Sequence, residues 1–393
     1  MAGRKTKPQK PYPDYPLFAH ANGQWAKKIN DRLHYFGVWN EPNAALDKYL
    51  RERDYLKNGR TPPASDDTRT TVRDACNVFL TSRKHRLDAG ELQPRTFHDY
   101  IQVCERVCGQ LGKEQPVEDL TPQDFEKLRA WMAAKWGAVT VGNEIQRVKT
   151  VFTYAFNAGL IEKPVRFGPD FRRPSRRTIR LARIKNGPRM FEAHELRTVL
   201  NEATNPLRAM ILLGINCGFG NTDCSGLTFD DLQAPLDWIN VARHKTGIPR
   251  RNPIWPETCE AIEDWLRARR RMAPYEREDV DLLFLTCQGR PFVRVKETHT
   301  DGGVKRTPID KLGPEMGKLL KRLGIKRRNI GFYALRHTFA TIGGESRDQV
   351  AVNALMGHVD DSMAGVYRER ISDERLIAVS DTVRQWLFDG EDA

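Results

Sequence analysis

Apolar side chains recur every three to four positions in four stretches between residues 66 and 165. This spacing is typical of amphipathic α-helices. The third stretch opens with Thr121 and Asp124, which form a helix-capping signal, and Pro122 between them suits the first helical position. We therefore predict a helical domain whose helices cover residues 69–87, 94–111, 121–135 and 139–158.

The pattern before residue 60 is different. Residues 25–29 and 33–36 read as two short strands joined by the turn residues Asn30 and Asp31. A helix follows, with Asn40 as its expected N-cap. We predict a basic tail and a small unit of sheet and helix over residues 1–60.

The strands of this small unit carry Lys27 and Lys28 among aromatic residues. Two interpretations remain open. The sheet either lies on DNA or is a solvated sheet over an aromatic core.

Two tracts interrupt the regular patterns. Residues 57–67 have the composition of a linker. Residues 166–189 carry nine Arg and Lys against a single Asp, with three prolines and two glycines, and we expect no regular structure there. This tract is either a flexible hinge or a linker that follows DNA phosphates. Its candidate contacts are Arg172, Arg173, Arg176 and Arg177, and Arg147 and Lys149 on the preceding helix join them.

Residues 190–393 alternate helices with a small sheet. Residues 207–218 are almost entirely apolar and predict a buried helix. Residues 237–255 predict two strands, with Lys245 just before a turn at Thr246 and Gly247. The tail, 371–390, is amphipathic. The expected fold class for the chain is mainly α with small β-sheets (α+β).

Charge favours a polyanionic partner. The chain has 64 Lys and Arg against 51 Asp and Glu, a formal charge of +13. The start lacks an apolar signal region and no run of about 18 apolar residues occurs, so we expect a cytoplasmic protein without a membrane partner. Seven cysteines without a CxxC pair argue against a disulfide framework or a zinc site, and Cys104 and Cys108 are expected in a helical core. We expect no metal and no cofactor.

The most informative residues lie near the carboxyl end. Arg336 and His337 occur in "YALRHTFAT", and Gly357 and His358 precede Tyr367, which follows His358 by nine residues. With Lys245 in the hairpin, this ordered set resembles the catalytic domain of the tyrosine recombinases, the phage-integrase family. The resemblance covers roughly residues 69–385 of the chain. It identifies 66–165 as a SAM-like core-binding domain, 166–189 as a basic linker and 190–393 as the catalytic domain. Residues 1–60 resemble the arm-type DNA-binding unit of some integrases.

The resemblance implies the chemistry. Tyr367 would attack a DNA phosphodiester and form a 3′-phosphotyrosyl bond, which conserves the energy needed for resealing without ATP or metal. Arg336 would bind the charged phosphate oxygens. Lys245 would protonate the leaving 5′ oxygen. His337 and His358 would bond phosphate oxygens or help to place Tyr367.

Two residues depart from the family pattern. Gly220 in "GFGNTDCSGL" stands where the first catalytic arginine belongs, and Tyr333 stands where a histidine is usual. Either another arginine supplies the missing contact, or the chain binds DNA without recombining it efficiently. Arg243, Arg250 and Arg251, on or beside the hairpin, are the candidate donors and candidate DNA contacts.

The leading hypothesis is a site-specific tyrosine recombinase, or integrase, that binds double-stranded DNA and assembles as a tetramer on it. A DNA-binding regulator on the same scaffold is the alternative, and a type IB topoisomerase is a third. In this family the C-terminal helix docks on a neighbouring protomer, although the tail could equally pack on its own domain. An accessory DNA-bending protein is a possible further partner.

Overall fold

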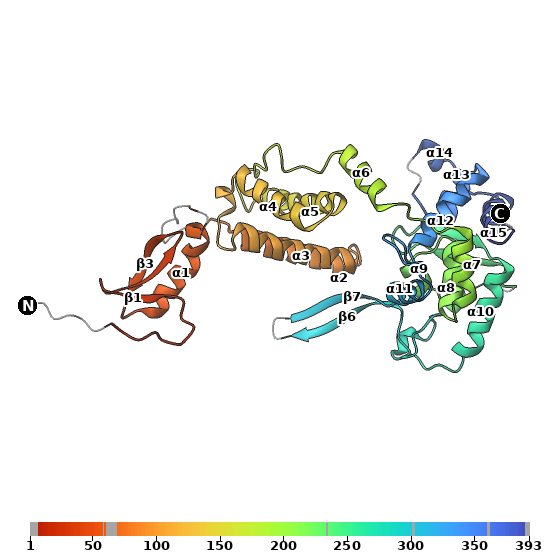
Figure 1. Cartoon of the computed structure of the whole chain (residues 1–393), viewed down its shortest axis with the longest axis horizontal. Coiled ribbons are helices and arrows are strands. Elements are labelled where there is room, and N and C mark those ends of the chain that lie inside the picture. The colour runs from red at the N-terminus through yellow and green to blue at the C-terminus, as the bar shows by residue number, and fades with distance from the viewer. Residues whose placement is uncertain are drawn as a thin grey trace, which may run out of the picture. The chain divides into compact units, whose positions relative to one another are not determined.

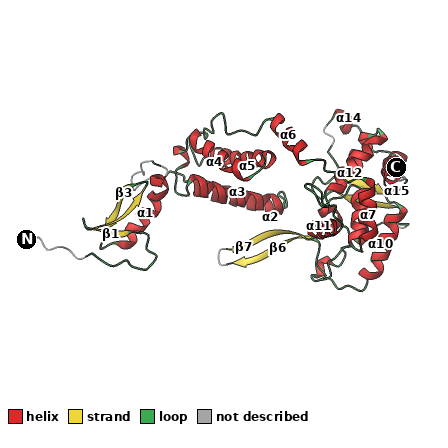
Figure 2. Ribbon diagram, viewed as in Figure 1, coloured by secondary structure: helices red, strands yellow, loops and turns green. Residues whose placement is uncertain are grey.

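The computed structural model describes residues 7–57, 59, 69–232, 235–300, 303–359 and 362–389. The predicted linker at 57–67 therefore lies almost wholly outside the described residues, as does the start of the basic tail. The fold is mainly helical with small antiparallel sheets, as predicted (Figure 2). The chain forms two compact units, Met1–Ala182 and Arg183–Ala393, and Figure 1 labels their elements.

The first unit begins with a three-stranded antiparallel sheet. Its strands β1 (Phe18–His20), β2 (Gln24–Ile29) and β3 (Arg32–Val38) lie in chain order, and α1 (Pro42–Lys57) packs on one face. Asn30 and Asp31 both have positive φ, 48° and 62°, as a tight turn between right-twisted strands requires. The predicted N-cap at Asn40 is wrong: the first helical hydrogen bond runs from the Ala45 amide to the Glu41 carbonyl, so the helix begins one residue later.

A second core in this unit consists of the four predicted helices. They are α2 (Val72–Asp88), α3 (Pro94–Leu111), α4 (Pro122–Lys135) and α5 (Ala138–Asn157), with a short 3₁₀ turn, η1 (Val117–Asp119), between α3 and α4. The Thr121 amide and hydroxyl both contact Asp124 Oδ2, at 2.8 Å each, which confirms the capping pair. Cys104 is buried in the core and Cys108 packs at its edge. Within the described residues, no three His, Cys, Asp or Glu side chains are grouped as metal ligands would be.

The basic tract is more regular than we predicted. Phe167 and Phe171 pack into the second core, and residues Arg176–Asn186 form the helix α6. Ser175 starts this helix, since its hydroxyl accepts a hydrogen bond from the Thr178 amide at 3.1 Å. The expectation of irregular structure over 166–189 was wrong because its prolines and glycines flank this segment and leave 176–186 uninterrupted.

The second unit is a helical domain around one large core. Its sheet elements are two hairpins, β4 (Trp238–Ala242) with β5 (Pro249–Pro253) and β6 (Val293–Thr300) with β7 (Gly303–Asp310). The first confirms the predicted hairpin with Lys245 in its turn, and the second was missed. The helices are α7 (Ala193–Glu202), α8 (Leu207–Asn216), α9 (Asn221–Ser225), α10 (Pro256–Arg269), α11 (Leu312–Arg322), α12 (Ala334–Gly343), α13 (Gln349–Leu355), α14 (Met363–Val366) and α15 (Asp373–Phe388), with 3₁₀ turns η2 (Phe229–Asp231), η3 (Arg277–Asp279) and η4 (Gly344–Ser346).

Helix α8 is the centre of this core, and every residue from Ala209 to Asn216 is buried, as its apolar pattern predicts. Asn216 is the polar exception. Its amide group donates to the Pro253 carbonyl and the Ser380 hydroxyl, both at 3.0 Å, and its Oδ1 accepts from the Trp255 amide at 2.9 Å. These bonds satisfy a buried polar group and join α8, the end of β5 and α15.

The C-terminal helix α15 packs on its own domain. Its four apolar residues, Leu376, Val379, Val383 and Leu387, are buried against the core, and α15 contacts α7, α8, α12 and α13. This is the second of the two interpretations of the tail. The apolar stripe is thus already covered within the chain.

Candidate active site

Arg336, on α12, is the most buried of the predicted catalytic residues, at 3% relative exposure. Its Nη1 donates to the Gly218 carbonyl at 2.6 Å and its Nη2 donates to the Met356 carbonyl at 2.7 Å. Burial lowers the pKa of Arg336 to about 10, and the nearby cation of Arg243 adds to this effect. The guanidinium stays protonated at neutral pH and is fixed in place by carbonyl groups.

His358 lies beside Arg336, with its Nε2 3.1 Å from Arg336 Nη2. A guanidinium can only donate, so Nε2 accepts and Nδ1 carries the proton, which faces Asn353 Oδ1 at 3.4 Å. Partial burial lowers the pKa of His358, and the cations of Arg336, Arg243 and Lys245 lower it further. The imidazole is therefore neutral at pH 7 and polarised by three cations.

The turn of the β4–β5 hairpin is tied to the Gly357 segment. The Gly357 carbonyl accepts hydrogen bonds from Arg243 Nη1 and Thr246 Oγ1, both at 3.2 Å. Gly357 has a φ of 63°, and a Cβ there would lie 2.9 Å from Arg250 Cδ. Both the conformation and the close packing require glycine before His358.

Lys245 is exposed in this turn, close enough to lower the pKa of His358. Tyr367 ends the short helix α14 and is 77% exposed. His337 is exposed on α12, one residue from Arg336, and its ring stands edge-on to that of Tyr333 at 5.5 Å. Burial lowers the pKa of His337, with Arg189 and Arg336 contributing. The structure thus brings Arg336, His358 and Lys245 together. Among the described residues, no hydrogen bond joins Tyr367 to them.

The two departures from the family pattern face each other. Gly220 precedes α9 in an extended conformation, with φ of −96°, that any residue can adopt. Its amide donates to Asp223 Oδ2 at 2.8 Å. A Cβ on Gly220 would lie 3.4 Å from Cε2 of Tyr333. A side chain at position 220 would therefore begin in ordinary van der Waals contact with the Tyr333 ring.

Arg250 is a buried arginine on β5, whose side chain is 0% exposed. Its Nη2 pairs with Asp223 Oδ1 at 2.9 Å, and its guanidinium lies 4.4 Å from the ring centre of Phe219. Nη1 is buried and has no hydrogen-bond partner in the part of the chain that the structure describes. Arg250 thus stabilises the loop before α9 through its contacts with Phe219 and Asp223.

Arg251, on the same strand, is paired elsewhere. Its Nε and Nη2 both bond the carboxylate of Asp373 at 2.9 Å, and its guanidinium stacks over Trp238 at 4.0 Å. Two of the three arginines that the sequence offered as donors are therefore engaged with carboxylates.

The Asp223 pair gives a stability prediction. Asp223→Ala leaves the buried Arg250 cation uncompensated, and this should destabilise the second unit by about 3–5 kcal/mol. The matched control is Asp373→Ala, which breaks the half-exposed pair with Arg251 and should cost about 0–1 kcal/mol. Urea unfolding of the full-length variants, followed by tryptophan fluorescence, measures both. Equal losses in the two variants would contradict the structural role of Asp223.

The other predicted DNA contacts have varied surroundings. Arg147 is bonded to Asp99 and Glu144, at 2.5 and 2.7 Å, and so belongs to an ion-pair network. Lys149 lies over the Phe167 ring at 5.4 Å. Lys27 donates to the Pro16 carbonyl at 2.8 Å, whereas Lys28 is exposed beside Asp31.

The arginines of the basic tract are the more accessible group. Arg172, Arg176 and Arg177 are exposed, and the stem of Arg173 packs over Gly142, where a Cβ would lie 2.7 Å from its Cγ. These side chains present positive charge on the surface of the first unit.

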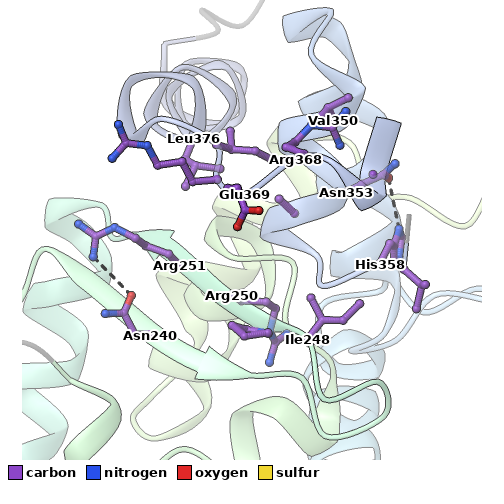
Figure 3. Close-up of a pocket in the computed structure, with 16 residues that line it drawn as sticks. Asn240, Ile248, Arg250, Arg251, Val350, Asn353, His358, Arg368, Glu369 and Leu376 are labelled. Atoms are coloured by element: carbon purple, nitrogen blue, oxygen red, sulfur yellow. Dashed lines mark hydrogen bonds between the residues drawn. The ribbon is translucent and has the colours of Figure 1, made fainter. Parts of the chain in front are cut away.

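A cavity of about 760 Å³ lies between the β4–β5 hairpin, α13 and the segment that follows Tyr367 (Figure 3). Its lining includes Arg250, Asn353, His358, Arg368 and Glu369. The sequence analysis did not name Asn353 or Arg368. Asn353 lies five residues before His358 and contacts it, so this spacing was the available signal.

Comparisons with known proteins agree with this geometry. Residues 189–374 match the model of the phage integrase family. The tyrosine recombinase XerC of Pseudomonas entomophila (strain L48) is 26% identical over 176 residues, which are 44% of this chain and 51% of that protein. The chain thus spans about half the length of this curated relative.

Solved structures show the same fold. A lambda integrase dimer bound to a COC′ core site has a TM-score of 0.56 at 14% identity, over 77% of this chain and all of that one. A lambda integrase tetramer bound to a Holliday junction has a TM-score of 0.55 at 15% identity, over 92% and 98% of the two chains. The Tn1549 transposon integrase in complex with transposon right end DNA has a TM-score of 0.54 at 15% identity, over 79% and 99%. In the described residues, no helix is long and apolar enough to cross a membrane.

Proposed function

This chain belongs to the phage integrase family, the tyrosine recombinases, through residues 189–374, and from that membership we propose that it cuts and rejoins DNA at specific sites through Tyr367. Residues 66–165 are its core-binding domain, 166–189 its basic linker and 190–393 its catalytic domain. Residues 1–60 form an arm-type DNA-binding unit.

One observation carries the proposal. Arg336, Arg243, Lys245 and His358 converge, and neither arginine has a carboxylate partner among the described residues. Cations placed this close repel one another unless an anion lies between them. A DNA phosphate supplies that anion, with two non-bridging oxygens for the donors.

The roles follow from the chemistry of each group. The exposed Tyr367 hydroxyl attacks the phosphorus and releases its proton to solvent, and the bond from phosphorus to the 5′ oxygen breaks. Arg336 stabilises the charge that gathers on the non-bridging oxygens, as a fixed donor that needs no reorganisation. Lys245 gives a proton to the leaving 5′ oxygen. His358, neutral and held by Arg336 and Asn353, fixes the Arg336 guanidinium in place beside the phosphate, and His337 helps to place the nucleophile.

A covalent trap tests this function. The full chain is first used to select a binding site from random duplexes, and the selected duplex is then nicked so that the cleaved strand diffuses away. We expect an adduct that survives denaturation and maps to Tyr367. Binding without an adduct would favour the regulator, and relaxation of supercoiled plasmid without site preference would favour the topoisomerase.

We also propose that the chain assembles on double-stranded DNA as a tetramer, since one recombination event cuts four strands and each protomer has one Tyr367. The lambda integrase tetramer on a Holliday junction supports this assembly. The apolar stripe of the tail is buried within its own domain, so this stripe does not form the contact between protomers. An accessory DNA-bending protein is compatible with the proposal.

The basic tract gives a prediction about affinity. Replacing Arg172, Arg173, Arg176 and Arg177 with Gln should weaken binding to all DNA sequences. Each lost phosphate contact should flatten the slope of log K against log salt by about 0.9. Titrations of the full chain at several salt concentrations measure the slope.

The matched control removes the same charge from four exposed side chains outside the tract, Lys84, Arg86, Arg267 and Lys318. A slope that changes equally in both variants would mean that net charge alone matters. The tract would then be a hinge.

A further inference from the structure

Position 220, where the arginine is missing, carries no side chain and supplies no cation to the site. Gly220 faces the ring of Tyr333, and the first atom of any side chain there would already be in van der Waals contact with it. The scissile phosphate of the proposed reaction therefore lacks one of its two arginine contacts unless another element provides it. The hairpin arginines are the candidates within reach.

Arg250 and Arg251 do not fit this role. Arg250 is fully buried, and its charge is used by Asp223. Arg251 is held by both carboxylate oxygens of Asp373, in a pair that faces α15. To reach a phosphate, either side chain would have to leave a carboxylate.

Arg243 has the properties that the others lack. It is partly exposed at the start of the turn that carries Lys245. Nη1 donates to the Gly357 carbonyl, which anchors the guanidinium beside His358. In the described parts of the chain no carboxylate pairs with it, and its cation lies near the Arg336 guanidinium and the neutral His358 ring, whose pKa values it lowers.

We propose that Arg243 is a catalytic residue that binds a non-bridging oxygen of the scissile phosphate in place of the arginine missing at position 220. This inference rests on the proposed function. Arg336 has already committed Nη1 and Nη2 to two carbonyl groups and to His358, so it can serve the phosphate with few of its donors. Arg243, on the β4–β5 hairpin, supplies the remaining charge. Lys245 and Arg243 then both contact the phosphate from the turn of this hairpin.

The test compares two nicked duplexes of the selected site, one with an ordinary scissile phosphate and one with a methylphosphonate, in which a methyl group replaces a charged oxygen. Arg243→Ala should slow formation of the Tyr367 adduct by about a hundredfold or more on the phosphate. On the methylphosphonate, which has no negative charge to neutralise, the variant and the wild type should react at nearly equal rates. Arg243→Lys should retain part of the rate, and DNA affinity should change little.

Arg267→Ala is the matched control, because it removes an exposed arginine of the same unit that pairs only locally with Asp264. It should react as the wild type does on both duplexes. Equal slowing of Arg243→Ala on both substrates would show a structural role and overturn the proposal, as would no slowing at all. If the wild type forms no adduct on either duplex while it binds both, the proposed function itself fails, and the role of Arg243 fails with it.

Discussion

Tyr367→Phe is expected to abolish the covalent adduct completely while leaving DNA affinity and folding unchanged. The substitution removes the attacking oxygen and keeps the ring. Tyr367 is exposed at the end of α14, and its hydroxyl has no hydrogen-bond partner among the described residues, so little stability depends on it. Denaturing electrophoresis of the full chain on the nicked duplex measures the adduct, and a titration on the intact duplex measures affinity.

Tyr275→Phe is the matched control for this change. Tyr275 also lies in the second unit, and its exposed fraction is 60%. Its ring contacts the guanidinium of Arg290. This variant should form adduct at the wild-type rate. An adduct that persists in Tyr367→Phe would mean that another side chain attacks the phosphate.

Lys245→Ala should slow cleavage by about 10²–10⁴-fold, the usual contribution of a general acid, with DNA affinity nearly unchanged. A duplex with sulfur in place of the leaving 5′ oxygen should restore the rate, because a thiolate leaves without a proton. Lys245 is exposed in the hairpin turn, so the substitution should leave the fold intact. Single-turnover adduct formation on the two duplexes measures the rescue.

Two controls define this result. Tyr367→Phe should gain nothing from the 5′-thio duplex, because its defect is in the nucleophile. Arg243→Ala should gain little, because charge on the non-bridging oxygens is the same in both duplexes. If the 5′-thio substrate leaves Lys245→Ala as slow as before, Lys245 binds or orients the DNA and another group donates the proton.

Features set by neighbouring residues could be predicted from the sequence. The four helices α2 to α5 follow from apolar spacing, and the Thr121–Asp124 cap follows from two residues three positions apart. The hairpin around Lys245 was predictable because a short turn joins two strand-like runs. Each of these depends on contacts within about one turn of helix or one hairpin.

Features set by distant residues could not be predicted. Nothing near Gly220 indicates that Tyr333 fills the space beside it, and nothing near Arg250 indicates that Asp223 neutralises it. The sequence offered three arginines as possible donors and could not distinguish among them. Their contacts in the structure distinguish them. The β6–β7 hairpin was missed because polar and charged residues together outnumber the apolar residues of its strands and weaken the apolar pattern.

The facing of Gly220 and Tyr333 has a consequence for stability. A side chain at position 220 would begin 3.4 Å from the Tyr333 ring, so a substitution at either position changes the surroundings of the other. The two positions are therefore energetically coupled. A double-mutant cycle over Gly220→Ala and Tyr333→Ala should show changes in stability that are not additive.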